Sequence, residues 1–239
     1  INRVMMPLTN PQQLSIIIRQ TENNKMPCLN QTQFHIVCTI ENGNQDYFLT
    51  KLKSFFPSTE FNVEFYFENE YEYRGILKVW QLGQIHNGAN DVILYYHSKG
   101  TTRGEHYWMF ANDHYNGVLY NLPRVFDVFD KYDYVDKVGE SCGGNGWIWY
   151  NFWYVRGSYV KHVEKPIKTN RRHYYEDWLG RKVKNDSDLI CENERPIHFY
   201  ENTLHTCYCF HTNINVPNQG YFYNSENSIF YPIYMFGKV

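Results

Sequence analysis

The sequence predicts an α/β fold in which helices flank a mixed, mostly parallel sheet. The first observation is a hydrophobic pattern that changes repeatedly, between residues 34 and 96, from the alternation of a strand to the spacing of a helix. The second is the resulting order of strand, helix, strand, helix and strand, which builds parallel sheets through right-handed crossovers. A length of 239 residues is enough for a single large domain with a sizeable core.

Each element of this first half ends at a recognisable turn signal. Pro57 closes the first helix, and Asn90 with Asp91 precedes the third strand. In chain order, we expect a strand at 34–40, a helix at 46–56, a strand at 61–67, a helix at 74–85 and a strand at 92–96. Residues 1–33 hold three prolines and many amides, so we expect an N-terminal extension followed by one domain at 34–239.

The second half of the chain is richer in aromatic residues and less regular. Gly117 and Pro123 interrupt a helical region there, and a run of glycines precedes the most aromatic stretch. The expected elements are a helical region from 105 to about 129, a short strand at 134–139, an aromatic strand at 147–155, a helix at 171–181 and an alternating tail at 197–239.

Composition excludes several classes of protein. With 23 basic and 25 acidic residues the chain lacks the cationic excess of a nucleic-acid binder, so we expect no nucleic-acid partner. No apolar stretch approaches the ~20 residues that span a bilayer, and no basic-then-apolar leader is present at the start. The six cysteines are scattered through a chain far larger than a disulfide scaffold, so we expect them to be reduced thiols. We therefore expect a cytoplasmic protein without a transmembrane segment.

The strand at 92–96 runs directly into His97, Ser98, Lys99 and Gly100. Ligands of open α/β sheets bind beyond the carboxyl ends of the strands, so this tip is expected to lie where substrate is bound. Lysine can meet a phosphate as a compact cation, glycine lets backbone N–H groups approach it, and histidine can bind a metal or donate a hydrogen bond. The alternative is a solvated turn with an incidental histidine.

Glu176 and Asp177 form an acidic pair between Tyr174, Tyr175 and Trp178. On a helix, adjacent side chains point about 100° apart, so one carboxylate can face a cleft while the other caps the helix or pairs with an arginine. Aromatic surroundings disfavour the charged form of an acid, which suits a general base near neutral pH. The alternative is an ordinary amphipathic helix with a solvated acidic pair.

Three further patterns in the sequence have both a functional and a structural interpretation. Trp147 and Trp149 share one face of a strand after a glycine-rich turn, which is typical of a stacking platform for sugars or bases and equally of a buried aromatic strand. Histidines and cysteines alternate from His205 to His211, but same-face residues of one strand lie ~6.6 Å apart, too far for a tetrahedral zinc site. The Asp-X-Asp of residues 186–188 lies in a polar stretch and is expected on the surface.

Taken together, these motifs resemble glycosyltransferases of GT-A type encoded by large DNA viruses and bacterial polysaccharide gene clusters. The resemblance extends over residues 34–181 and is carried by 93–100, by 144–149 leading into 155–160, and by Arg171 followed by 176–180. It implies a Rossmann-like GT-A domain that transfers a hexose or pentose from a nucleotide-sugar donor to a hydroxyl of a glycan or glycoconjugate, with inversion.

If the protein is viral, as some of the enzymes it resembles are, we expect it in the host cytoplasm. The resemblance also implies roles for individual residues. Thr39 and Glu41, at the end of the first expected strand, would face the base and ribose of the nucleotide. The tip of His97, Ser98, Lys99 and Gly100 would occupy the place where relatives usually carry a metal-binding Asp-X-Asp. Asn145, Trp147 and Trp149 would line the sugar pocket, and Glu176 or Asp177 would deprotonate the acceptor hydroxyl.

Because the acidic pair is absent from the tip, two readings of the diphosphate site stay open. Either Lys99, helped by Arg103, neutralises the leaving diphosphate, or His97 contributes to a site for Mn²⁺ or Mg²⁺. A glycosidase is disfavoured because it needs two facing acids. Two other classes remain, a non-catalytic carbohydrate-binding protein with a retained cleft and a nucleotide-dependent hydrolase.

Overall fold

The structure is a computed structural model of the 239-residue chain. The residues it describes are 2–6, 33–40, 43–58, 60–97, 122–133, 135–139, 148, 151–180, 206–210, 219–224 and 230–234. For the strands at 2–6, 206–210, 219–224 and 230–234, it describes the backbone and its pairing.

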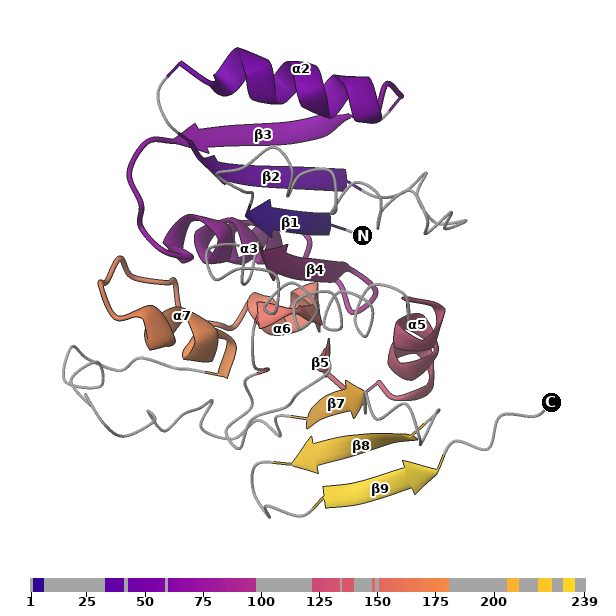
Figure 1. The fold of residues 1–239 in the computed structure, drawn as a ribbon. Coiled ribbons are helices and arrows are strands. Elements are labelled where there is room, and N and C mark those ends of the chain that lie inside the picture. Colours follow the sequence, from indigo (N-terminus) through magenta and orange to yellow (C-terminus); the bar gives the residue numbers. More distant parts are fainter. Residues whose placement is uncertain are drawn as a thin grey trace.

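The described strands form one open sheet in the order β3-β2-β1-β4-β6-β5-β7-β8-β9 (Figure 1). The strands are β1 (Asn2–Met6), β2 (Gln33–Thr39), β3 (Phe61–Tyr66), β4 (Val92–His97), β5 (Lys137–Gly139), β6 (Trp153–Arg156), β7 (Thr206–Phe210), β8 (Gln219–Asn224) and β9 (Phe230–Tyr234). Strands β3, β2, β1 and β4 are parallel. Strand β6 runs antiparallel to both β4 and β5, β7 is parallel to β5, and β8 and β9 continue antiparallel.

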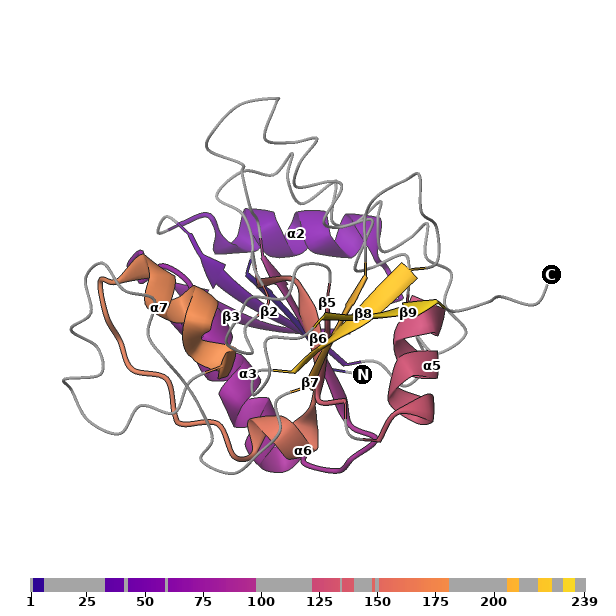
Figure 2. The same ribbon diagram turned by 90° about the horizontal axis from the view of Figure 1, so that it is seen from below.

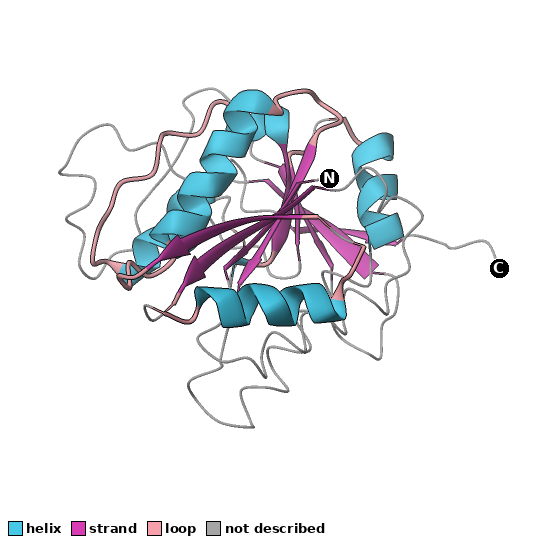
Figure 3. Ribbon diagram, turned by 90° about the horizontal axis from the view of Figure 1, so that it is seen from above, coloured by secondary structure: helices cyan, strands magenta, loops and turns pink. Residues whose placement is uncertain are grey.

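Helices cover both faces of this sheet. They are α2 (Gln45–Phe55), α3 (Tyr73–Ile85), α5 (Leu122–Lys131), α6 (Gly157–Val160) and α7 (Arg172–Asp177), which a 3₁₀ turn at Trp178–Gly180 extends. Helix α2 lies on one side of the sheet and α3, α6 and α7 lie on the other (Figures 2 and 3). No helix in the described part of the chain combines the length and the apolar character that crossing a bilayer requires.

The two faces have separate cores because side chains alternate along each strand. In β4, Val92, Leu94 and Tyr96 pack with α2 and α5. Ile93 and Tyr95 point the other way and pack with α3, α6 and α7. All five side chains are buried. The near-continuous apolar run is therefore a central strand covered on both faces, as parallel sheets require.

The mixed α/β class and the parallel pairing through β4 are confirmed. The described sheet as a whole is not mostly parallel, because four of its eight strand pairings are antiparallel. Two expectations about the elements are corrected. Residues 2–6, expected outside the organised domain, form β1 between β2 and β4, so the strand ending at His97 is the fourth in chain order and not the third. The aromatic strand expected at 147–155 is shorter, since β6 begins at Trp153 and residue Ile148 forms an isolated bridge.

The strand order reverses between β1 and β4. From β1 the chain builds outward through β2 to β3, with α2 on one face, and then returns across β2 and β1 to β4, with α3 on the opposite face. Such a reversal is the switch point at which open α/β sheets bind ligands, outside the carboxyl ends of the strands. The carboxyl end of β4 is His97.

Candidate functional site

His97 is held against the sheet by its aromatic neighbours. Its ring stacks on Tyr95 with 6.3 Å between centroids and 7° between planes, and it lies 5.5 Å from the ring of Phe152. Glu72, immediately before the first residue of α3, brings its carboxylate to the same ring. Its Oε1 atom is 3.8 Å from His97 Nδ1, and both side chains are about nine-tenths buried, at 12% and 11% exposure. A carboxylate and an imidazole thus meet at the carboxyl edge of the sheet.

Two donors hold the carboxylate of Glu72 in place through its other oxygen. Asn151 Nδ2 donates a 2.6 Å hydrogen bond to Glu72 Oε2, and the Tyr95 hydroxyl lies 3.4 Å from the same atom. Burial, together with the charge of Glu72 and the hydrogen bond to it, raises the pKa of Tyr95 well above its ordinary value. Tyr95 therefore stays protonated and remains a donor, and Glu72 Oε1 is the oxygen turned toward His97.

Asn151 also links this carboxylate to α7. The same Nδ2 atom donates to the backbone carbonyl of Tyr175 at 3.1 Å. Tyr175 is fixed further by its hydroxyl, which accepts from Thr169 N at 2.8 Å and donates to Thr169 O at 2.7 Å. Its ring lies 6.4 Å from that of Tyr73, the first residue of α3. Helix α7 is therefore docked beside the start of α3 and the tip of β4.

Glu176 and Asp177, the predicted base candidates, follow Tyr175 directly and are both buried, at 7% and 6% exposure. The interpretation of a solvated acidic pair is therefore wrong. Its premise was an amphipathic helix, but all residues from 174 to 180 are buried because α7 passes into a 3₁₀ turn that packs into the core on the α3 side. Glu176 Oε2 lies 3.7 Å from Nδ1 of the exposed His173.

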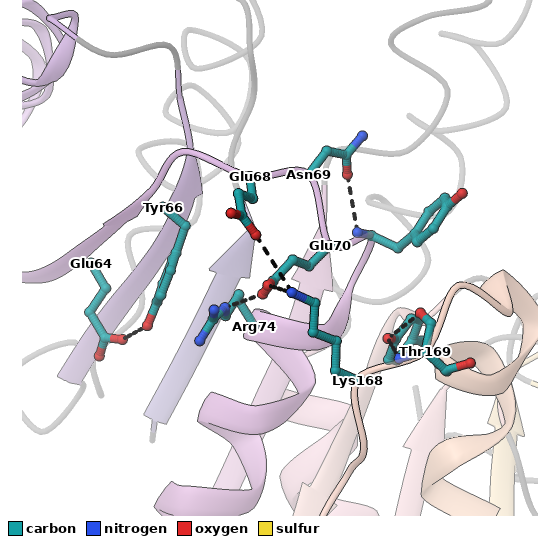
Figure 4. Close-up of polar contacts among 10 residues, drawn as sticks. Glu64, Tyr66, Glu68, Asn69, Glu70, Arg74, Lys168 and Thr169 are labelled. Carbon is teal, nitrogen blue, oxygen red and sulfur yellow. Dashed lines mark hydrogen bonds and ion pairs between the residues drawn. The ribbon is translucent and has the colours of Figure 1, made fainter.

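An ion-pair network ties the segment before α7 to the loop after β3 (Figure 4). Glu70 is buried between Arg74 and Lys168 and forms an ion pair with each, and Lys168 Nζ also lies 3.6 Å from Glu68. Burial alone raises the pKa of Glu70, but hydrogen bonds and charges from Lys168 and Arg74 outweigh it and hold that pKa below its ordinary value. Glu70 is therefore ionised at neutral pH, and the loop is anchored on both sides.

The remaining predicted site residues fall into two groups. Thr39 ends β2, half-buried, at the same edge as His97 and two strands away, roughly 10 Å along the sheet. It lies on the second strand of the chain, so its assignment to the end of the first strand is corrected. Outside the described residues are Glu41, Ser98, Lys99, Gly100, Arg103, Asn145, Trp147 and Trp149, together with Asp186, Asp188, His205 and His211.

Sequence reasoning missed Glu72 and Asn151. Glu72 carries a weak signal, since an acid directly before a helix interacts favourably with the positive end of the helix dipole. Asn151 carries a clearer one, being a polar residue inside an aromatic run. Its backbone adopts a left-handed conformation with φ of 55°, which asparagine tolerates better than most residues.

A divalent cation finds two candidate ligands among these residues. Glu72 Oε1 and His97 Nδ1 face each other, and imidazole with carboxylate suits a transition metal better than Mg²⁺. Across the described ranges, no group of three histidine, cysteine or acidic side chains converges as a metal site would. The pair fits at most part of a coordination shell, so no chemical step is derived through a metal.

A hollow of about 470 Å³ lies over the end of α5, lined by Asp127, Val128, Asp130, Lys131 and Tyr132. These residues lead into the start of β5, which runs in the same direction as β4, so the hollow lies at the opposite edge of the sheet from His97. It takes no part in the candidate site.

Comparison of the chain with protein-family models, with curated proteins and with solved structures found no match.

Proposed function

We propose that the protein is a glycosyltransferase of GT-A type that moves a sugar from a nucleotide-sugar donor to a hydroxyl of a glycan or glycoconjugate. One observation carries the proposal. At the switch point of the mixed sheet, Glu72, His97 and Asn151 converge beside a helix that buries two adjacent acids. Ligand-binding edges of open α/β sheets lie at this place, and functional carboxylates are often buried there.

The proposed chemistry needs two parts. A sugar nucleotide already contains a good leaving group, so the protein must stabilise the charge of the departing diphosphate and supply one base. His97 ends β4, and Lys99 and Arg103 follow it in sequence, so cationic groups are concentrated after the strand tip. Glu176 or Asp177 would remove the proton of the acceptor hydroxyl as it attacks the anomeric carbon in line, which inverts that centre.

The donor is proposed to lie across the carboxyl ends of the parallel strands. Since β1 is the first strand and neighbours β4, the nucleotide would extend from the end of β1 over the end of β2, where Thr39 lies. Asn145, Trp147 and Trp149 precede Asn151 closely in sequence, and we propose that they line the sugar pocket. Glu41 would complete the nucleotide contacts.

The first test measures donor binding and transfer separately. A panel of nucleoside diphosphate sugars, with and without manganese, is screened by thermal shift, because a ligand that binds the folded state raises the unfolding temperature. Release of nucleoside diphosphate is then followed with and without glycan acceptors. A response without metal supports Lys99 as the partner of the diphosphate. An absolute need for manganese counts against Lys99, and Glu72, His97, Asp186 and Asp188 become the candidate ligands.

Neutralising the acids one at a time tests the base. Either Glu176→Gln or Asp177→Asn is expected to lower transfer by roughly 10²- to 10⁴-fold while donor binding survives, because general-base catalysis contributes about that much. Asp46→Asn, at an exposed position in the first turn of α2, is the matched control and should leave transfer unchanged.

The other outcomes separate the competing classes. If neither acid matters, the base assignment is wrong. Turnover that proceeds at the full rate without an acceptor identifies a nucleotide-dependent hydrolase. Sugar binding without any turnover identifies a non-catalytic carbohydrate-binding protein.

A further inference from the structure

Asn151 is the residue at which the parts of the candidate site meet. Its amide contacts Glu72 before α3, the carbonyl of Tyr175 in α7 and the indole of Trp153 in β6. Trp153 Nε1 can only donate, so the atom that it contacts at 3.2 Å must be the amide oxygen. The amide nitrogen therefore faces Glu72 Oε2 and Tyr175 O, and each of its two hydrogens has an acceptor.

Few side chains satisfy this position. The residue is 1% exposed and has a φ of 55°, in the left-handed region. Glycine adopts that backbone easily but would leave a carboxylate, a carbonyl and an indole N–H without their partner. Aspartate tolerates the backbone and keeps the shape, yet it offers only acceptors when ionised. Asparagine provides the backbone, the two donors and the acceptor together.

We propose that Asn151 is a positioning residue for sugar transfer, acting through Glu72 and through the main chain of α7. Glu72 faces His97 at 3.8 Å, and Tyr175 immediately precedes the acids Glu176 and Asp177. One amide thus sets the place of the carboxylate beside the strand tip and the place of the acid-bearing helix. This role rests on the proposed glycosyltransferase function, and it involves no contact between Asn151 and substrate.

The test compares two substitutions with a surface control. Asn151→Asp preserves the size of the side chain but turns a donor toward Glu72 into a negative charge. Asn151→Gly preserves the left-handed backbone and removes the side chain. Asn87→Asp makes the same chemical change at an exposed asparagine whose Nδ2 donates to Gln84 O at 3.2 Å on the surface.

The pH dependence of kcat should distinguish the two variants of Asn151. In Asn151→Asp, the new carboxyl and Glu72 can share one proton as pH falls, and the shared proton restores a hydrogen bond between them. Within the described part of the chain, the Tyr95 hydroxyl and His97, both from β4, also face Glu72. A protonated His97 would favour the ionised carboxylates and move this recovery to lower pH. Asn151→Gly has no group that can be rescued in this way.

We expect Asn151→Asp to lower kcat about 100-fold at pH 8, the loss that a misplacement of about 1 Å can cause, while the Kd for the donor stays nearly unchanged. Relative to the unaltered protein, its kcat should rise as pH falls. Asn151→Gly should stay low at every pH, and Asn87→Asp should match the unaltered protein throughout.

Three results would overturn the role. They are wild-type kcat in Asn151→Gly, a loss in Asn151→Asp that does not change with pH, and a loss of donor affinity without a loss of kcat. If Asn151→Asp does not fold, Asn151→Gly decides alone, by whether kcat falls while donor binding is kept. If the unaltered protein transfers sugar and the Asn151 variants transfer it equally well, only the proposed role of Asn151 is wrong. No transfer by the unaltered protein removes the proposed function and this role with it.

Discussion

Glu72 and His35 show how differently two polar side chains can be buried on the same side of the sheet. Glu72 receives hydrogen bonds from Asn151 and Tyr95. His35, on β2, is 8% exposed, and neither of its ring nitrogens has a hydrogen-bond partner among the described residues. An unsatisfied buried imidazole is stable only when neutral, so burial first and the charge of Lys78 second lower the pKa of His35 to about 4, against the opposing charge of Glu64.

This histidine should make the protein less stable in mild acid. Its pKa is lower in the folded state than the ordinary value of 6.5, so the unfolded chain binds the proton first as pH falls. Stability from this group is complete above pH 6.5 and is lost progressively between pH 6.5 and 4, by about 3 kcal/mol in all. Urea unfolding at pH 7 and pH 4.5 measures it.

The variant His35→Leu isolates the contribution of His35, because a leucine side chain binds no proton. Its free energy of unfolding should fall less between the two pH values than that of the unaltered protein. His162→Leu, at an exposed position, should behave like the unaltered protein. An equal loss in all three proteins would show that acid destabilisation comes from other groups.

At the residue scale, chemistry could be predicted only where neighbours in sequence are neighbours in space. His97 at the strand tip and the acids Glu176 and Asp177 were predicted as site residues because each motif is short and local, and the structure places His97 at the carboxyl edge of the sheet and buries both acids. Glu72 and Asn151 are 79 residues apart, and a pairing over that distance leaves no pattern in one sequence. The aromatic run around Asn151 drew attention to its tryptophans instead.

Helix α3 owes its position to a close approach on its outer side. A Cβ atom added at Gly83 would lie 2.3 Å from Val160 Cγ1 and 2.6 Å from Val160 Cβ, in the neighbouring helix α6. Glycine is needed here for space, and its backbone stays helical. The contact fixes how α3 crosses the sheet and hence where Glu72, just before its first residue, is delivered.

Gly83→Ala is therefore expected to destabilise the protein by about 1 to 2 kcal/mol, because overpacking outweighs the better helix propensity of alanine. Chemical denaturation measures the change. Val160→Ala alone should also destabilise, by leaving space. Together the two substitutions should cost less than the sum of their separate effects, and strict additivity would contradict direct packing between these residues.

At the scale of elements, the helices and parallel strands of residues 33–97 follow the sequence closely because their hydrophobic periods are long and uninterrupted. Helix α7 lies where the sequence predicts a helix, but the amphipathic pattern did not predict that its acidic residues are buried. A helix of six residues is too short for its pattern to reveal which side is covered, and the 3₁₀ turn that buries Asp177 depends on packing against distant elements.

At the scale of the molecule, the class of fold was predictable and the membership of the sheet was not. Strand β1 is five residues long, lacks a clear alternation and is separated from β2 by a long stretch, so nothing local marks it as the strand next to β4. Its insertion places the reversal of strand order beside His97. The carboxyl edge at His97 therefore lies at the switch point of the sheet, where open α/β sheets bind ligands, and the sequence alone did not predict that placement.

The most direct measurement of the central claim is where a nucleotide sugar binds. Two-dimensional NMR of the protein labelled at histidine ring nitrogens, with His97 assigned through His97→Gln, reports on the carboxyl edge. His35 reports on the interior, and His86, after the end of α3, reports on the opposite edge. The account predicts that a nucleoside diphosphate sugar shifts the His97 resonances and leaves those of His35 and His86 in place. Unchanged His97 resonances with shifted His86 resonances would contradict it.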